Sequence, residues 1–274
     1  MVTTWNTENL GGTGSATKVI LLPISAGPSV DWGDGTVDNL NTHTYASGGV
    51  KTVKIYGYVT GWAFNNGGDC LKITDVSDVG GWRPSSEAFH GCSNLTWSAT
   101  GPLNTKASSF NQLFRGCTAF NGDVSEWDTS NIISLANTFK DCIVFNQDVS
   151  GWDTSSCASF AAVFRGCAAL NPNIGGWDTS SATTMNSMVR DSLFNRDISG
   201  WDISGVTTMT NMMNGSAFST TNYDLLLPAW EAQAVQNNVS FHAGSATYGA
   251  GTPATARAAL IADHTWTITD GGPT

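Results

Sequence analysis

Residues 114–130 read FRGCTAFNGDVSEWDTS, and a close copy, FKDCIVFNQDVSGWDTS, starts 25 residues later at Phe139. Two further copies follow, and the tryptophans of the four copies are Trp127, Trp152, Trp177 and Trp201. An earlier, degenerate copy has Pro102 where a tryptophan is expected, as is usual for a terminal unit. A fixed period of this length predicts stacked repeats, none of which can bury its apolar face alone.

Within one repeat, the apolar spacing predicts three segments. A short strand is expected near 131–135, a helix of one or two turns near 136–142, and an irregular return from 145 to 152. The predicted fold class is therefore a leucine-rich-repeat-like solenoid with a short strand and a short helix in each coil of about 25 residues.

The two ends of the chain have different patterns. Residues 18–22, 30–36 and 52–56 are expected to be strands, with a tight turn at Asp34-Gly35. At the other end, helices are expected over 223–234 and 252–263, followed by a strand from Trp266. We predict three domains: a β-rich module (1–62), the repeats (63–216) and a C-terminal α/β cap (217–274).

The cysteines follow the repeat. Four of the six fall in one column at 25-residue intervals and one in a second column: Cys92, Cys117, Cys142 and Cys167, then Cys157. We expect buried free thiols at these positions, because a thiol is a small apolar group that fits a narrow core. Disulfides and a metal site are the alternatives.

Two polar columns also recur. The asparagines predict a buried ladder in which each side-chain amide bonds the next coil: Asn121, Asn146, Asn171 and Asn195. The aspartates after the tryptophans would repel when stacked: Asp128, Asp153, Asp178 and Asp202. We expect each to accept hydrogen bonds from its own Asp-Thr-Ser turn. No cofactor is predicted, and calcium held by this column is the alternative.

A hydroxyl face is the candidate ligand-binding site. The residues expected to point outward from the strand are Ser134, Ser159, Thr183, Thr184, Thr207 and Thr208. They could contact a glycan or a protein, or be only a solvated surface. Trp62, Trp82 and Trp97, near the irregular first coils, would stack on sugars if exposed, and otherwise belong to the core.

Charge and hydropathy restrict the partners. The net charge is -10, and the 12 Lys and Arg residues form no run in the sequence, so we expect no nucleic-acid partner. No apolar stretch is long enough to insert into a membrane. The N-terminus lacks the pattern of a signal peptide, so the chain is expected to fold in the cytoplasm where it is made.

The repeat resembles the 26-residue surface-protein repeat of the BspA-like leucine-rich proteins, and residues 254–272 are similar to the end of such proteins. Residues 30–36, with Thr42-His-Thr-Tyr45 and Val53-Lys-Ile55, resemble a PKD-type (Ig-like) module. BspA-like proteins occur on bacterial surfaces and in phage virions. The resemblance implies an adhesive surface or virion protein and implies no catalytic residues.

From these observations we expect a non-enzymatic protein on the surface of a phage virion: a tail or head-fibre adhesin, or a capsid decoration. Its partners would be other virion proteins and a glycan or receptor on the host, and a homo-oligomer is compatible with the sequence. A bacterial cell-surface adhesin is the first alternative. A virion polysaccharide depolymerase is the second, although the glutamates and histidines form no catalytic pattern.

Overall fold

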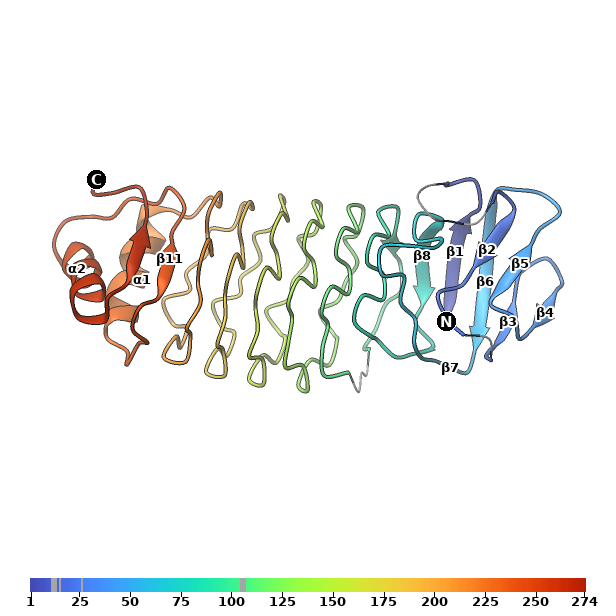
Figure 1. Cartoon of the computed structure of the whole chain (residues 1–274), viewed down its shortest axis with the longest axis horizontal. Coiled ribbons are helices and arrows are strands. Elements are labelled where there is room, and N and C mark those ends of the chain that lie inside the picture. The colour runs from blue at the N-terminus through green and yellow to red at the C-terminus, as the bar shows by residue number, and fades with distance from the viewer. Residues whose placement is uncertain (11–13, 15, 26, 104–106) are drawn as a thin grey trace.

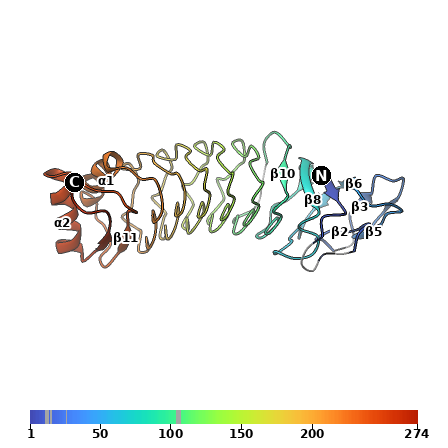
Figure 2. The ribbon, with the colours of Figure 1, turned by 90° about the horizontal axis from the view of Figure 1, so that it is seen from above.

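The chain forms an elongated molecule in which successive coils lie side by side between a sheet at one end and two helices at the other (Figure 1). The view from above shows the same row of coils (Figure 2). This computed structural model describes residues 1–274 except 11–13, 15, 26 and 104–106. One hydrophobic cluster extends through the length of the molecule, from Met1 to Trp266.

The N-terminal end is built on a six-stranded sheet with the strand order β10-β8-β1-β6-β3-β4. The strands of this sheet are β1 (Val2–Asn6), β3 (Ser29–Asp31), β4 (Val37–Asp38), β6 (Val50–Tyr56), β8 (Ile73–Asp78) and β10 (Thr96–Trp97). Only the pairing of β10 with β8 is parallel. The sheet thus includes strands on both sides of the predicted boundary at residue 62, and the domain division itself stays a prediction.

Two small sheets lie beside the large one. They pair β2 (Val19–Leu21) with β5 (Thr42–Thr44), and β7 (Tyr58–Val59) with β9 (Gly81–Trp82). The predicted turn at Asp34-Gly35 is confirmed, because β3 and β4 pair on either side of it. Gly33 is required there: its φ is +78°, and a Cβ atom would collide with the carbonyl oxygen of Thr52.

The predicted fold class, a leucine-rich-repeat-like solenoid with a strand and a helix in every coil, is wrong. In the described residues the strands form four sheets, and both helices lie after residue 219, outside the repeats. Within 98–219, the described residues contain turns and isolated β-bridges, with neither a helix nor a regular strand. The molecule is therefore mainly sheet and turn.

Backbone conformation explains the missing helix at 136–142. Asn137 and Asp141 have φ values of 58° and 63°, in the left-handed region, so the chain cannot continue the i to i−4 hydrogen bonds of an α-helix. The N–H groups of Asn137 and Asp141 instead donate to Ala161 O (2.9 Å) and Arg165 O (2.7 Å) in the next coil. Between them, Phe139 N also donates to the next coil, at Val163 O (2.9 Å), while the N–H groups of Thr138 and Lys140 make i to i−3 turn bonds. Each coil thus uses these residues to bind its neighbour.

The predicted strand at 131–135 is reduced to one bridging residue per coil. The parallel bridges join Ser109, Ser134, Ser159, Thr184 and Thr208 in succession. Aromatic rings fill the interior of the coils and stack on the rings of neighbouring coils. Phe139 lies 5.8 Å from Phe114 and 5.7 Å from Phe164, in nearly parallel planes. These rings supply the apolar contact that a single repeat lacks.

The C-terminal end follows the prediction closely. Helix α1 is Thr220–Glu231, α2 is Thr252–His264, and the parallel strands β11 (Ser240–His242) and β12 (Thr267–Thr269) pair with each other. Phe241 of β11 forms a parallel bridge with Met209 of the last repeat. The terminal segment therefore continues the contacts of the repeats and covers their last apolar surface.

The cysteines are confirmed as buried free thiols. In the main column, Sγ donates to the carbonyl oxygen of a phenylalanine in the preceding coil at Cys117, Cys142 and Cys167, for example from Cys142 to Phe114 (2.9 Å). Burial raises the pKa of Cys92, Cys117 and Cys142 well above the ordinary value. Burial also raises the pKa of Cys157, to about 11.

The folded protein is therefore expected to resist thiol reagents. At about pH 8 these groups remain protonated, and the thiolate is the reactive form. We expect dithionitrobenzoate to modify the native protein slowly and all six thiols rapidly in guanidinium chloride. Rapid modification of more than one thiol in the native protein would contradict this burial.

Candidate functional site

The six predicted ligand-binding residues lie together on the repeats, in two adjacent columns. Ser134, Ser159, Thr184 and Thr208 form the bridging column, and Thr183 and Thr207 precede two of its members. Thr183, Thr207 and Thr208 are exposed, and the other three are half-buried. The structure therefore gathers these hydroxyls on one outer strip that crosses the coils.

Several of the hydroxyls also stabilise the backbone. Thr183 Oγ1 donates to Ala158 O (3.1 Å), and Thr207 Oγ1 donates to Thr183 O (3.2 Å), each in the preceding coil. Ser134 Oγ donates to Asn111 Oδ1 (2.6 Å). A ligand-binding role for these residues stays a prediction, but their positions are fixed from coil to coil.

The asparagine ladder exists, although it is not buried as predicted. Asn121 Oδ1 accepts the backbone N–H of Asn146 (3.0 Å), and Asn146 Oδ1 accepts that of Asn171 (2.8 Å). The series continues through Asn195 to Ser219 N, at the N-cap of α1. Asn121 and Asn146 are exposed and Asn171 is half-buried, although Asn121 and Asn146 directly follow the core residues Phe120 and Phe145.

Replacing Asn146 by alanine is expected to lower the free energy of unfolding by about 1 kcal/mol, because Asn171 N–H loses its acceptor. Asn146→Asp keeps an acceptor oxygen at this position and is the matched control, with a smaller expected loss. Urea denaturation of the two variants measures the difference. Equal losses in both would show that the side-chain oxygen contributes nothing.

The aspartates after the tryptophans form the local turns that the sequence predicts. Asp128 Oδ1 accepts both the N–H (3.2 Å) and the hydroxyl (2.7 Å) of Ser130, and Asp153, Asp178 and Asp202 repeat this pattern. The hydrogen bonds from Ser130 lower the pKa of Asp128, and those from Ser180 lower the pKa of Asp178. Favourable local bonds thus offset the stacking of like charges.

The aspartate column was also the alternative site for calcium. Calcium takes six to eight oxygen ligands, usually from several carboxylates and carbonyls. In the part of the chain that the structure describes, no three His, Cys, Asp or Glu side chains are grouped to hold a metal ion. Oδ1 of each carboxylate in the column is already bonded to its own turn. Calcium binding by this column stays an alternative prediction.

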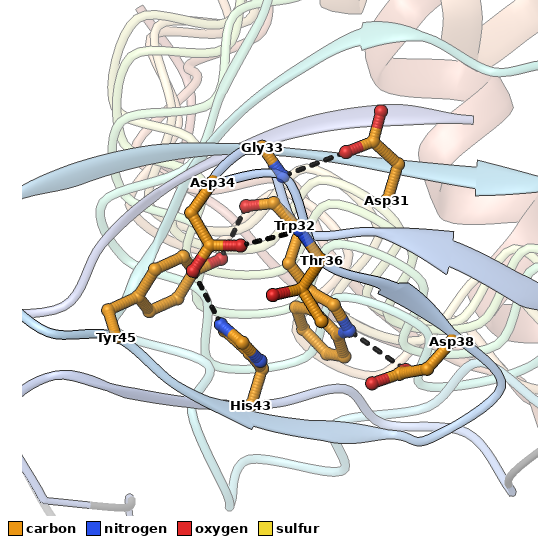
Figure 3. A network of polar contacts seen from close by, with 8 residues as sticks. All are labelled: Asp31, Trp32, Gly33, Asp34, Thr36, Asp38, His43 and Tyr45. Carbon is orange, nitrogen blue, oxygen red and sulfur yellow. Dashed lines mark hydrogen bonds and ion pairs between the residues drawn. The ribbon is translucent and has the colours of Figure 1, made fainter.

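The N-terminal sheet carries a separate polar network around Trp32 and His43 (Figure 3). The two rings stack at 5.1 Å, and His43 Nε2 lies 2.8 Å from Asp34 Oδ2. Tyr45 OH donates to Trp32 O (2.9 Å), and Trp32 Nε1 donates to Asp38 Oδ1 (3.0 Å). His43 therefore ties β5 to the turn between β3 and β4.

The tryptophans of the first coils belong to the core. Trp62, Trp82 and Trp97 are at most 8% exposed. Phe89 contacts all three rings, with centroid distances of 5.3 to 5.9 Å. Their faces are therefore covered by protein, and sugar stacking on them is not available in this structure.

One surface column escaped the sequence analysis. The residue after the first phenylalanine of each repeat, or after Val189 in the last, is basic in four successive coils: Arg115, Lys140, Arg165 and Arg190. Successive members are 25 positions apart, so they form no run of charge along the sequence. Aligning the repeats by their cysteines would have revealed the column.

The fold and these recurring columns define an elongated protein of stacked 25-residue repeats with a patterned polar surface. A family model described as "Mycoplasma protein of unknown function, DUF285" matches residues 85–193 and 155–249, and the chain belongs to this family. The match agrees with the resemblance to BspA-like repeats. No curated protein and no solved structure matches the chain. Among the described residues, no helix is long and apolar enough to cross a membrane.

Proposed function

We propose that this protein is a non-enzymatic surface protein of a phage virion, a tail or head-fibre adhesin or a capsid decoration, which binds a receptor or glycan on the host. The outer strip of the repeats is the observation that supports this proposal. Its hydroxyl groups recur at fixed positions along the stack, on a backbone in which every coil is hydrogen-bonded to the next. A regular row of polar groups suits a partner that is itself repetitive, such as a glycan.

A bacterial cell-surface adhesin is the second candidate, and the family match favours it, since its description refers to proteins of Mycoplasma. Both candidates bind their partner through the same strip. They differ in whether the protein is attached to a virion or to a bacterial cell. In both, we interpret residues 1–62 as a PKD-like module. Its Trp32–His43–Tyr45 network supports a rigid spacer role, because it ties the turn and β5 together.

Localisation tests the proposal. Purified particles from the source and washed, uninfected host cells are compared by mass spectrometry and by immunogold labelling with an antibody against residues 220–274. Labelling at a tail tip, fibre or capsid supports the virion protein. Labelling of uninfected cells alone would overturn it in favour of the bacterial adhesin, and labelling of neither surface would overturn both.

A further inference from the structure

The basic column consists of Arg115, Lys140, Arg165 and Arg190, one cation in each of four successive coils. These four residues are a third of the 12 Lys and Arg residues in a chain whose net charge is -10. All four are half-buried, and each directly follows a buried apolar residue: Phe114, Phe139, Phe164 or Val189. The fold therefore builds a local positive strip on an acidic protein.

Backbone hydrogen bonds hold these residues on successive coils. Gly116 N donates to Lys140 O (2.8 Å), Asp141 N to Arg165 O (2.7 Å) and Gly166 N to Arg190 O (2.8 Å). Each donor directly follows the preceding member of the column, so neighbouring members are one coil apart. Paired parallel backbones are separated by about 4.8 Å. The cations thus recur at a short, regular interval along the stack.

The positive charges are only partly compensated. Lys140 has a lowered pKa, first because of burial and then because Arg115 lies near, while Asp141 opposes the shift. Arg190 Nε lies 3.1 Å from Asp191 Oδ2. Arg115 donates to the neutral Gln112 Oε1 (2.6 Å). Within the described residues, Arg190 is the one member of the column with a carboxylate at ion-pair distance.

The hydroxyl column and the basic column belong to the same stretch of each coil, the one whose N–H groups bond the next coil. Ser134, Ser159 and Thr184 precede the cations of their own coils by six residues. The backbone hydrogen bonds that join the coils lie between the two positions. Leu135 and Phe139 point into the core at 0–1% exposure, so the outer surface between the columns carries small or amide side chains such as Ala136 and Asn137. A row of hydroxyls and a row of cations thus run in parallel across the coils.

We propose that this strip binds a linear carboxylated polysaccharide that runs along the stack, with sugar carboxylates at the basic column and sugar hydroxyls at the Ser/Thr column. The inference rests on the proposed glycan-binding function and names the chemistry of the glycan. Arginine pairs with carboxylates through two parallel hydrogen bonds, which suits a repeated acidic sugar.

A nucleic acid fits this strip less well. Single-stranded nucleic acids bind through aromatic platforms on which bases stack. In the described residues, the large exposed aromatic side chains are Tyr56 and Tyr58, which belong to the N-terminal sheets rather than to the repeats. The net charge of -10 also opposes a dense row of phosphates. A polymer with sparser charge and many hydroxyls matches the surface better.

Affinity electrophoresis and calorimetry of the full chain test the proposal with three probes: polygalacturonate, neutral dextran and oligothymidylate. At low salt we expect binding to polygalacturonate and none to dextran. The double variant Lys140→Gln/Arg165→Gln should lose at least about tenfold in affinity, because two of the four cations are removed. The matched control Lys18→Gln/Lys54→Gln removes the same charge from exposed positions near the N-terminus and should bind like the unmodified protein.

The unmodified protein provides a second readout that needs no variant, since its affinity for polygalacturonate should fall steeply as NaCl is raised. No binding, binding that is insensitive to salt, equal loss in both double variants or tighter binding to oligothymidylate would each overturn the proposal. If the binding test fails but the protein is located on a particle or cell surface, the proposed function stands. Polygalacturonate binding by a protein found on neither surface would overturn the proposed function alone.

Discussion

Replacing Lys72 by methionine is expected to lower the free energy of unfolding by about 3–5 kcal/mol. The side chains of Lys72 and Asp69 are both fully buried, with Nζ 3.2 Å from Oδ1. Lys72 Nζ also donates to Val19 O (2.8 Å), and Asp69 Oδ2 accepts the N–H of Leu21 (2.7 Å). The pair therefore fastens β2 to the segment that leads into β8.

The size of the effect comes from the charge that remains. Methionine has nearly the length of lysine and fills the same space, so packing changes little. The carboxylate of Asp69 stays buried without the ammonium group that balances it, and burying a charge in this way is costly. Loss of the bond to Val19 O adds a smaller contribution.

Two further variants isolate the charge effect. The double variant Asp69→Asn/Lys72→Met removes both charges and should be more stable than Lys72→Met alone. Lys54→Met changes an exposed lysine on β6 and should stay within about 0.5 kcal/mol of the unmodified protein. Guanidinium denaturation measures all three. A loss below about 1 kcal/mol for Lys72→Met would show that the buried pair contributes little.

Phe139→Ala is expected to destabilise the protein by a similar amount, about 3–5 kcal/mol. The ring is fully buried and lies 4.0 Å from that of Phe145 in its own coil, and it stacks on Phe114 and Phe164 in the coils on either side. Removing it leaves a cavity shared by three coils. Because repeat proteins are stabilised mainly by contacts between neighbours, the defect weakens two interfaces at once.

Hydrogen exchange locates this defect. The amides of Phe114 and Phe139, which bond Thr138 O and Val163 O, should exchange faster in Phe139→Ala, while amides of the N-terminal sheet should be nearly unchanged. Phe139→Leu keeps most of the volume and is expected to lose less stability. Ile133→Ala, at a residue 53% exposed, is the surface control. Uniform acceleration over the whole chain would contradict a local effect.

The sequence predicted the two ends of the molecule better than its middle. The Asp34-Gly35 turn and the proline at Pro253 identified a hairpin and a helix start, since both signals act within a few residues. In the repeats, the apolar spacing of Leu135, Phe139 and Cys142 imitates a helix. The spacing is helical, but residues with positive φ and hydrogen bonds to the next coil determine the backbone conformation.

A signal for that backbone was present in the sequence. The position occupied by Asp141 and Asp191 is glycine in other repeats, such as Gly116 and Gly166, and all four have positive φ. Glycine, aspartate and asparagine tolerate this conformation better than other residues, so their alternation in one column indicates a turn rather than a helix. Comparing repeats column by column would have corrected the prediction.

The candidate site was also predictable in part, by comparing equivalent positions of the repeats. The hydroxyl column follows from the repeat itself, because Ser134 and Ser159 occupy equivalent positions. The exposure of Asn121 and Asn146 was not predictable, since a ladder of amides satisfies its hydrogen bonds equally well in the core or at the surface. The basic column required knowing that Lys140 and Arg165 are neighbours in space although distant in the chain.

The interfaces between coils are alike, and this has an evolutionary consequence. Phe114 N donates to Thr138 O as Phe139 N donates to Val163 O. The N–H groups of each coil thus donate to the following coil, and its carbonyl oxygens accept the equivalent bonds from the preceding coil. An in-frame duplication of 25 codons would therefore insert a coil without altering the bonds at either end. Each insertion would extend the molecule by about 4.8 Å. Recombination between the repeats can thus change the length of the protein while the contacts between its coils stay the same.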